Sequence, residues 1–168
     1  MVSFRDLVKD IESTTYATHS LYMYPAKFIP HVIRYVIDRY SEPGDWLVDP
    51  FAGSGSIAIE ATLTGRNAVL WDLNPIIDIL VKASTYKGEL SIADFDVDLD
   101  FDKKYIPTWD NITYWYHKEF FEVLCRMWGW WHNKVPDRIK PVVAIPLLKI
   151  SRYFSYADLQ VAKLYKSK

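Results

Sequence analysis

One part of this sequence has residue types and a spacing that indicate a ligand-binding site. It consists of a glycine-rich loop and two acidic residues. The loop Phe51–Ser56 holds Gly53 and Gly55, and it follows Asp49 at the end of a short apolar run. Because glycine has no Cβ, such a loop lets the backbone approach a ligand closely, and the next helix offers free N–H groups. Asp72 ends the next apolar run, 23 positions after Asp49. An acid at that place typically accepts hydrogen bonds from the hydroxyl pair of a ribose.

The residues around the loop discriminate between nucleotide ligands. A dinucleotide fingerprint tolerates Ala58 as its third small residue, but the Asp-Pro-Phe that precedes the glycines is foreign to it. A phosphate-binding P-loop is excluded because no Gly-Lys-Ser/Thr ending is present. The Asp49 carboxylate would repel a pyrophosphate but suits a cationic ligand. A nucleoside with a positive charge and no phosphate describes S-adenosylmethionine. The alternative, a tight turn without a ligand, is disfavoured by the two acids at strand ends.

The elements that must position these residues alternate between strand and helix. An amphipathic helix is expected from Pro30 to about Tyr40, before a Pro-Gly turn. The next elements, by hydrophobic pattern, are a strand, a helix, a strand and a helix at Trp46–Val48, Ile57–Thr64, Ala68–Trp71 and Ile76–Lys82. This order predicts an α/β fold with a βαβ unit of a parallel sheet.

Composition limits the classes of protein that fit this sequence. The 168 residues suit one domain. The net charge of −1 excludes binding to nucleic acid or to an anionic membrane through the overall charge of the protein. A single cysteine, Cys125, excludes an internal disulfide framework and a cysteine-rich zinc site, and we expect no metal. No apolar run approaches the roughly 18 residues of a membrane span, and the first residues lack the apolar core of a signal peptide. We therefore expect a cytoplasmic protein.

The stretch Asp49–Ser56 (DPFAGSGS) resembles the cofactor motif of the DNA amino-methyltransferases, which methylate N4 of cytosine or N6 of adenine. Trp71–Pro75 (WDLNP) resembles the acidic motif that follows it, and Thr18–Phe28 resembles the element that packs over the methionine moiety in that family. Looser similarity in Tyr114–Tyr116 and Lys149–Tyr156 favours the N4-cytosine branch. The resemblance implies a Rossmann-like class I methyltransferase fold, incomplete in this chain, and a setting in restriction–modification.

The resemblance also implies a cofactor site for S-adenosylmethionine. Asp49 and the glycines would line the cofactor, Asp72 would hold the ribose, and Leu73 would cover the adenine. A segment near the N-terminus would close the methionine end. The full set of implied cofactor-binding residues is Thr18, His19, Pro25, Lys27, Phe28, Asp49, Pro50, Phe51, Gly53, Gly55, Ser56, Asp72, Leu73 and Asn74.

The catalytic motif of that family, Ser/Asp/Asn-Pro-Pro-Tyr/Phe, is missing, because the chain contains no Pro-Pro pair. In the family this motif hydrogen-bonds the target amino group and stacks on the flipped base. We therefore expect no catalytic residue in this chain, and a second chain or a missing segment that supplies the motif and covers an exposed apolar edge. A split subunit, a truncated piece and a degenerate remnant all fit this pattern. The rival functions are an RNA or small-molecule methyltransferase and a non-catalytic subunit that binds cofactor or DNA.

The single domain 1–168 is expected to divide in character into a cofactor-binding core, 18–83, and an aromatic-rich helical region with a basic tail, 84–168. Asn111–His132 is expected to be helical, with its aromatics in a core or an interface. Alternating acids and apolar residues predict an amphipathic strand over Asp94–Asp102. The residues that could contact the phosphates of double-stranded DNA are Lys149, Arg152, Lys163 and Lys166. A solvated tail explains them equally well.

Overall fold

The structure is a computed structural model that describes residues 13–25, 27–109 and 111–157. The chain divides into two compact units, residues 1–86 and 87–168. The division falls three residues after the expected end of the cofactor-binding core, and the expectation of a single domain stays a prediction. Among the described residues, no helix has the length and apolar character needed to cross a lipid bilayer.

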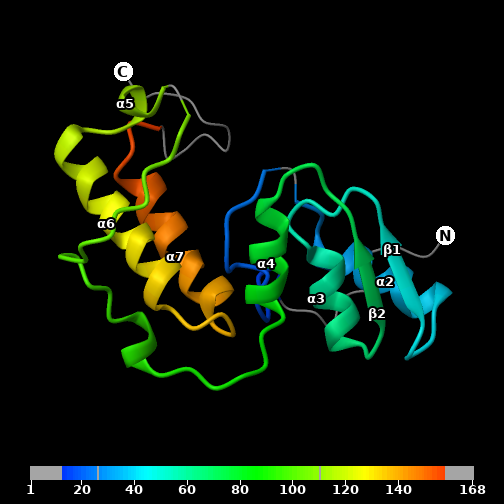
Figure 1. Ribbon diagram of the computed structural model, residues 1–168. Coiled ribbons are helices and arrows are strands. Elements are labelled where there is room, and N and C mark those ends of the chain that lie inside the picture. The colour runs from blue at the N-terminus through cyan, green and yellow to red at the C-terminus, as the bar shows by residue number, and fades with distance from the viewer. Residues whose placement is uncertain (1–12, 26, 110, 158–168) are drawn as a thin grey trace. The chain divides into compact units, whose positions relative to one another are not determined.

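The first unit contains a small parallel sheet with its helices. The elements in chain order are α2 (Pro30–Tyr40), β1 (Trp46–Asp49), α3 (Ser56–Leu63), β2 (Asn67–Leu70) and α4 (Ile76–Ser84). Strands β1 and β2 pair in parallel, with Leu47 opposite Ala68, and they lie side by side in Figure 1. Helix α3 connects the two strands and contacts both of them. The predicted α/β class and parallel βαβ unit are therefore confirmed, and each element lies within a few residues of its predicted range.

Local chemistry explains the limits of these elements. Pro30 begins α2, where its missing N–H costs no helical hydrogen bond. The helix ends at Ser41, whose hydroxyl donates to the carbonyl oxygen of Ile37 at 2.7 Å. Helix α3 is apolar on most of its surface and carries the core of the unit, with Ile59 and Ala61 almost fully buried. The sheet that positions the site therefore depends on one central helix.

The second unit is helical. Its elements are the short 3₁₀ helix η1 (Ile92–Phe95) and the helices α5 (Ile112–Trp115), α6 (Lys118–Lys134) and α7 (Lys140–Tyr153). Helices α6 and α7 pack through a buried cluster of Leu124, Met127 and Leu147. The indole N–H groups of two α6 tryptophans hold α7, because Trp128 donates to the Ser151 hydroxyl at 3.0 Å and Trp131 donates to the Lys140 carbonyl at 2.8 Å. The aromatic stretch therefore serves packing here.

One prediction for this region was wrong, and a second was right only in part. The strand expected over Asp94–Asp102 is a 3₁₀ turn followed by irregular chain. The acids fold back on the local backbone instead: the Asp94 carboxylate accepts the Ser91 N–H at 2.7 Å, and Asp98 accepts the Asp100 N–H at 3.0 Å. Such short-range bonds compete with a sheet ladder. The helix expected over Asn111–His132 is broken at Tyr116, where the backbone is extended and the ring packs against the α6–α7 cluster.

Candidate functional site

The glycine-rich loop joins β1 to α3 and is held to the end of β2. The Asp49 carboxylate accepts the Phe51 N–H at 3.0 Å, so the chain turns directly after the strand. The Ala52 N–H then donates to the Trp71 carbonyl oxygen at 2.9 Å. Gly55 has φ +75°, and a Cβ at this position would lie 2.5 Å from a methyl group of Val81 on α4. A side chain at position 55 would therefore require Val81 or the backbone of α4 to shift.

Asp72 connects the glycine loop to the chain after β2. One oxygen of its carboxylate accepts the Gly53 N–H at 2.7 Å, and the other accepts the Asn74 N–H at 2.8 Å. These two backbone hydrogen bonds, from Asn74 and Gly53, lower the pKa of Asp72. An ionised carboxylate has about four acceptor positions, so two remain for hydroxyl donors of a ligand. The two acids and the glycines that the sequence singled out thus lie at the carboxyl ends of neighbouring parallel strands.

A hollow of about 610 Å³ opens beside this loop, between α2 and β1. Six of the predicted cofactor residues line it: Lys27, Phe28, Asp49, Phe51, Gly53 and Ser56. Tyr24, which the sequence analysis did not select, lines it too, and a Cβ at Gly53 would lie 3.3 Å from the Tyr24 ring. The sequence signal that could have identified Tyr24 is its position, because this aromatic residue lies four residues before Phe28, a predicted site residue of the same segment. The volume is of the size that small-molecule sites usually have.

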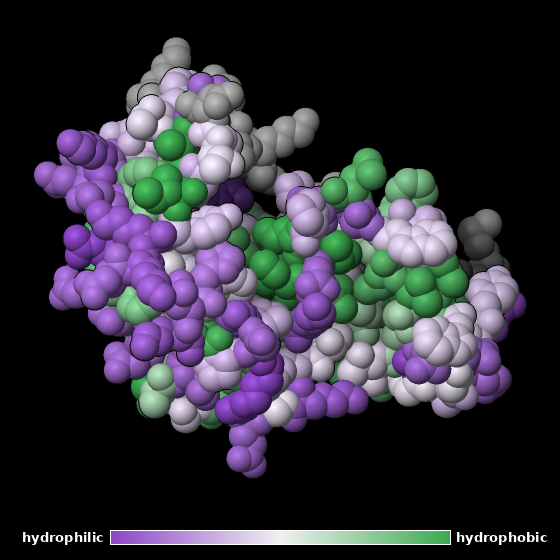
Figure 2. Space-filling view, in the orientation of Figure 1, coloured by the Kyte–Doolittle hydropathy of each residue, from purple (hydrophilic) through white to green (hydrophobic). Residues whose placement is uncertain are grey.

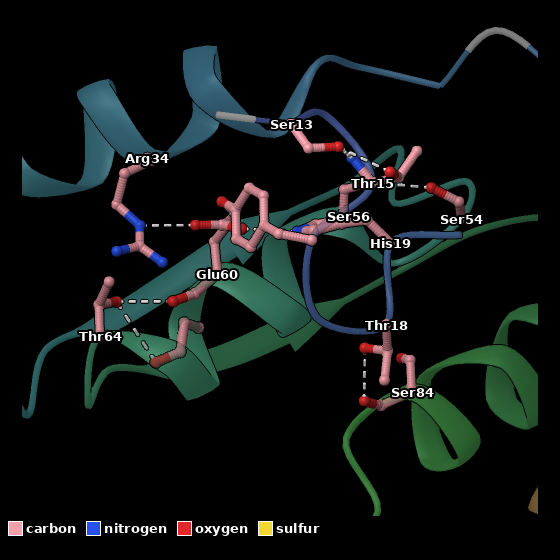
Figure 3. Close-up of polar contacts among 12 residues, drawn as sticks. Ser13, Thr15, Thr18, His19, Arg34, Ser54, Ser56, Glu60, Thr64 and Ser84 are labelled. Atoms are coloured by element: carbon pink, nitrogen blue, oxygen red, sulfur yellow. Dashed lines mark hydrogen bonds and ion pairs between the residues drawn. The ribbon is translucent and has the colours of Figure 1, made fainter. Parts of the chain in front are cut away.

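A buried carboxylate on α3, Glu60, holds the N-terminal segment against the site (Figure 3). One of its oxygens accepts the Tyr16 hydroxyl at 2.5 Å and His19 Nε2 at 2.6 Å, and the other accepts Arg34 Nε at 2.6 Å. Because a carboxylate only accepts, His19 carries its hydrogen on Nε2. Burial opposes ionisation of Glu60, but the hydrogen bonds from His19, Tyr16 and Arg34 outweigh it and lower its pKa. We name these four residues the Glu60 cluster.

The sequence analysis missed Glu60, Tyr16 and Arg34, although one signal was available. Glu60 is a single charged residue in the otherwise uncharged helical run Ser56–Leu63, and a buried charge needs partners. The cluster accounts for His19, whose side chain is fully buried. His19 was predicted to line the cofactor, which stays a prediction, and the structure places its Nε2 on Glu60.

The rest of the N-terminal segment is held by backbone carbonyls. The Thr18 hydroxyl donates to the Ser84 carbonyl at the end of α4, at 2.8 Å. The Lys27 ammonium donates to the His19 carbonyl, and burial lowers the pKa of Lys27. Thr18, His19 and Lys27 share a second, much smaller cavity with Ser54. The segment predicted to close the methionine end is therefore attached to α3 and α4 and lies beside the glycine loop.

The remaining predicted site residues lie at the periphery of the loop or outside the described chain. Gly55 is buried, and the exposed residues are Pro25, Pro50, Leu73 and Asn74. In the second unit, Lys149 is exposed and Arg152 is half-buried on α7. Lys163 and Lys166 lie outside the described residues. No group of three or more His, Cys, Asp or Glu among the described residues could hold a metal ion.

Comparison with known proteins adds independent findings. The profile of a family described as DNA methylase matches residues 7–82. The type II methyltransferase M.MjaII of Methanocaldococcus jannaschii is 25% identical over 128 residues, which cover 69% of this chain and 24% of the relative. The type II methyltransferase M.MvaI of Kocuria varians is 24% identical over 172 residues, which cover 92% of this chain and 38% of the relative.

A third relative matches over a short segment. The type II methyltransferase M.MthZI of Methanothermobacter thermautotrophicus is 44% identical over 39 residues, which cover 23% of this chain and 11% of the relative. The chain thus spans less than half the length of each of these relatives. No solved structure matches it significantly.

Proposed function

We propose that this chain is the cofactor-binding part of a DNA methyltransferase, because residues 7–82 match the profile of a family described as DNA methylase, whose members use S-adenosylmethionine as methyl donor. The reaction is transfer of a methyl group to the exocyclic amino group of a base in double-stranded DNA, with N4 of cytosine preferred over N6 of adenine. The proposed setting is a restriction–modification system in the cytoplasm. One observation carries the proposal: the Gly53 N–H donates to the Asp72 carboxylate at 2.7 Å, and Gly53 also lines the hollow beside β1.

The residues at this place fit the chemistry of the donor. When bound, S-adenosylmethionine supplies an electrophilic methyl group on a positively charged sulfur. The two unused acceptor positions of the Asp72 carboxylate suit the hydroxyl pair of its ribose. Asp49 and Phe51 line the same hollow, and there a carboxylate favours a cation while an aromatic face offers a stacking surface. The Glu60 cluster keeps Thr18 and His19 in position beside the glycine loop.

The missing half of the proposed enzyme is the catalytic motif. The chain contains no Pro-Pro pair, so we propose that a partner chain or a further segment supplies the motif. The isolated chain should then bind the donor without methylating DNA. This expectation also fits the second candidate function, a non-catalytic cofactor-binding subunit. Lys149 and Arg152 are proposed to contact DNA phosphates when the enzyme is assembled.

The test is a calorimetric titration of the purified chain with S-adenosylmethionine. Asp72→Asn removes the charge that accepts the ribose hydroxyls, and charge-assisted hydrogen bonds are worth about 1.5–3 kcal/mol each. We expect Kd to rise by roughly ten-fold or more in this variant. Asp78→Asn is the matched control, since Asp78 is exposed on α4 and pairs only with Lys82 among the contacts described. Equal affinity in Asp72→Asn and the control would refute the assigned role of Asp72. Methylation assays on DNA and RNA, with the partner present, would separate the DNA enzyme from the RNA alternative.

A further inference from the structure

A group of aromatic side chains lies on the surface of the second unit, where α5, the start of α6 and the end of α7 meet. We name it the aromatic patch, and its members, with exposed fractions from 39% to 64%, are Tyr114, Phe120, Tyr153, Phe154 and Tyr156. Figure 2 shows hydrophobic side chains at the end of this unit where α5 lies in Figure 1, on a surface that is otherwise mostly hydrophilic in this view. Such patches mark contact surfaces, because monomeric proteins rarely leave a large contiguous apolar area open to water.

Ring contacts join the aromatic patch although its members come from three segments. Phe120 on α6 stacks on Phe154 at the end of α7, with ring centroids 4.9 Å apart and 24° between the ring planes. The Tyr153 ring stands at 86° to the Phe154 ring, with centroids 5.1 Å apart. The Tyr156 N–H donates to the Trp115 carbonyl oxygen at 2.8 Å, which fixes α5 beside the same segment. The patch is therefore a defined arrangement of rings and not a set of independent side chains.

The packing of α6 on α7 is provided by other residues. The two helices pack through the buried cluster of Leu124, Met127 and Leu147, and the indole N–H groups of Trp128 and Trp131 donate to α7. The stacked pair of phenylalanines in the aromatic patch keeps more than 40% of each residue exposed. Packing within the unit therefore does not account for the exposed rings.

The charges beside the aromatic patch favour an anionic partner. Residues 149–157 contain Lys149 and Arg152 and no acid. Lys149 is exposed and lies one helical turn before Tyr153, on the same face of α7, and Arg152 is half-buried. Of the two acids in the first turns of α6, Glu122 is paired with Lys104 at 2.7 Å. The rings are thus bordered by cations on the α7 side.

We propose that the aromatic patch is a stacking surface for unpaired bases of DNA, with Lys149 and Arg152 at the adjacent phosphates. The identity of the nucleic acid rests on the proposed function, whereas the stacking surface rests on the exposed rings. Aromatic side chains stack on bases of any sequence, because every base has a π-face, and neighbouring cations hold the backbone. A methyltransferase that turns its target base out of the duplex leaves the opposite base without its partner. The patch would therefore bind DNA that is opened at the target.

Other partners fit the aromatic patch less well. A fully paired duplex buries its base faces in the stack, so it would use only Lys149 and Arg152. A second copy of this chain, bound patch to patch, would bring the same cations of both copies together, and like charges oppose such an association. The centre of a protein interface is typically depleted of charged residues, whereas cations border these rings.

The experiment measures the fluorescence anisotropy of labelled twenty-nucleotide DNA probes titrated with the purified chain. The probes are a single strand, its fully paired duplex and the same duplex with a three-base mismatched bubble. Tyr153→Leu removes the most exposed ring of the aromatic patch but keeps an apolar side chain, and Tyr153→Phe keeps the ring. Tyr105→Leu is the matched control, because Tyr105 is an exposed tyrosine of the same unit outside the patch. Circular dichroism verifies that each variant is folded.

We expect the wild type to bind the single strand and the bubble duplex about ten-fold more tightly than the paired duplex. Tyr153→Leu should lose about this factor on the two unpaired probes, because it has no ring for a base to stack on. Tyr153→Phe and the control Tyr105→Leu should bind them as the wild type does. Lys149→Gln should weaken binding to all three probes and reduce its salt dependence.

Unchanged affinity of Tyr153→Leu for the unpaired probes would overturn the proposal, as would equal binding of the three probes, or binding of none, by the wild type. Tighter binding of a single-stranded RNA of the same sequence would overturn it in favour of RNA. A wild-type dimer that Tyr153→Leu dissociates would overturn it too, by showing that a second copy covers the patch. The S-adenosylmethionine titration with Asp72→Asn probes residues of the first unit. Failure of the proposed function is therefore distinguishable from failure of this inference.

Discussion

Replacement of Glu60 by glutamine tests the role of the Glu60 cluster most directly. The Glu60 side chain is fully buried and accepts three hydrogen bonds, from Tyr16, His19 and Arg34. Glutamine keeps one oxygen for two of these donors but turns an NH₂ group toward the third. Each hydrogen bond to a charged group is worth about 1.5–3 kcal/mol, and breaking a buried ion pair costs about 3–5 kcal/mol. We therefore expect Glu60→Gln to lower the free energy of unfolding by about 3 kcal/mol.

Urea titration followed by circular dichroism measures this loss. With a denaturant slope of about 2 kcal/mol per molar urea, the midpoint should fall by roughly 1.5 M. The matched control is Glu42→Gln, in the same unit, because Glu42 is exposed and its side chain makes none of the contacts described. The control should stay within about 0.5 kcal/mol of the wild type. A loss as small as this in Glu60→Gln would refute the reasoning.

The same pair of proteins has an expected pH dependence. The folded pKa of Glu60 is lowered, so its ionised form contributes stability that is fully present above the unfolded pKa of about 4.3. This contribution is lost as the pH falls through the folded pKa. Glu60→Gln has no such group, so the stability difference between the two proteins should shrink in acid. A difference that stays constant from neutral pH to below pH 4 would contradict the lowered pKa.

Three further predictions concern packing. Gly55→Ala should lower the free energy of unfolding by about 2–4 kcal/mol in thermal or urea unfolding, because the φ of +75° is strained for alanine and the new methyl group would meet Val81. Val81→Ala should recover part of this loss, and strictly additive effects in the double variant would exclude the clash. Trp131→Phe should cost about 0.5–1.5 kcal/mol beyond any packing loss, because the Lys140 carbonyl loses its indole donor, and a neutral effect would show that water replaces it. Cys125 is buried, which raises the pKa of its thiol, so it should react with a thiol reagent only on unfolding, and fast reaction of the native protein would contradict this.

The first unit could be predicted from the sequence because its determinants are local. Strand β1, the glycine loop and α3 follow one another within Trp46–Leu63, and each is marked by its own residue types. The acid at the end of β2 is placed by the parallel register, since Asp49 lies opposite Leu70 and Asp72 follows two residues later. Short apolar runs, helical spacing and glycine placement were therefore sufficient to place the elements that carry the candidate site.

The wrong predictions lie where local and long-range interactions compete. The alternation over Asp94–Asp102 satisfies the pattern of a strand, but a strand needs a partner, and the aspartates bond to nearby backbone N–H groups instead. The sequence analysis missed the Glu60 cluster for the opposite reason. Its members lie 26 to 44 positions from Glu60 in the sequence, and no periodicity connects them. Long-range polar contacts of this kind are set by the tertiary fold and not by any local pattern.

The hydrogen bonds that build the candidate site come from a limited part of the chain. The hydrogen-bond partners of the glycine loop, Asp72 and Glu60 lie within residues 16–74, whereas Gly55 also lies against Val81 and the Thr18 hydroxyl donates to the Ser84 carbonyl. Among the described residues the sheet has only the strands β1 and β2, so each of them has one edge without a partner strand. Under the proposed function we therefore expect S-adenosylmethionine to bind the isolated chain, whereas methylation of DNA should require the partner or further segment that supplies the catalytic motif.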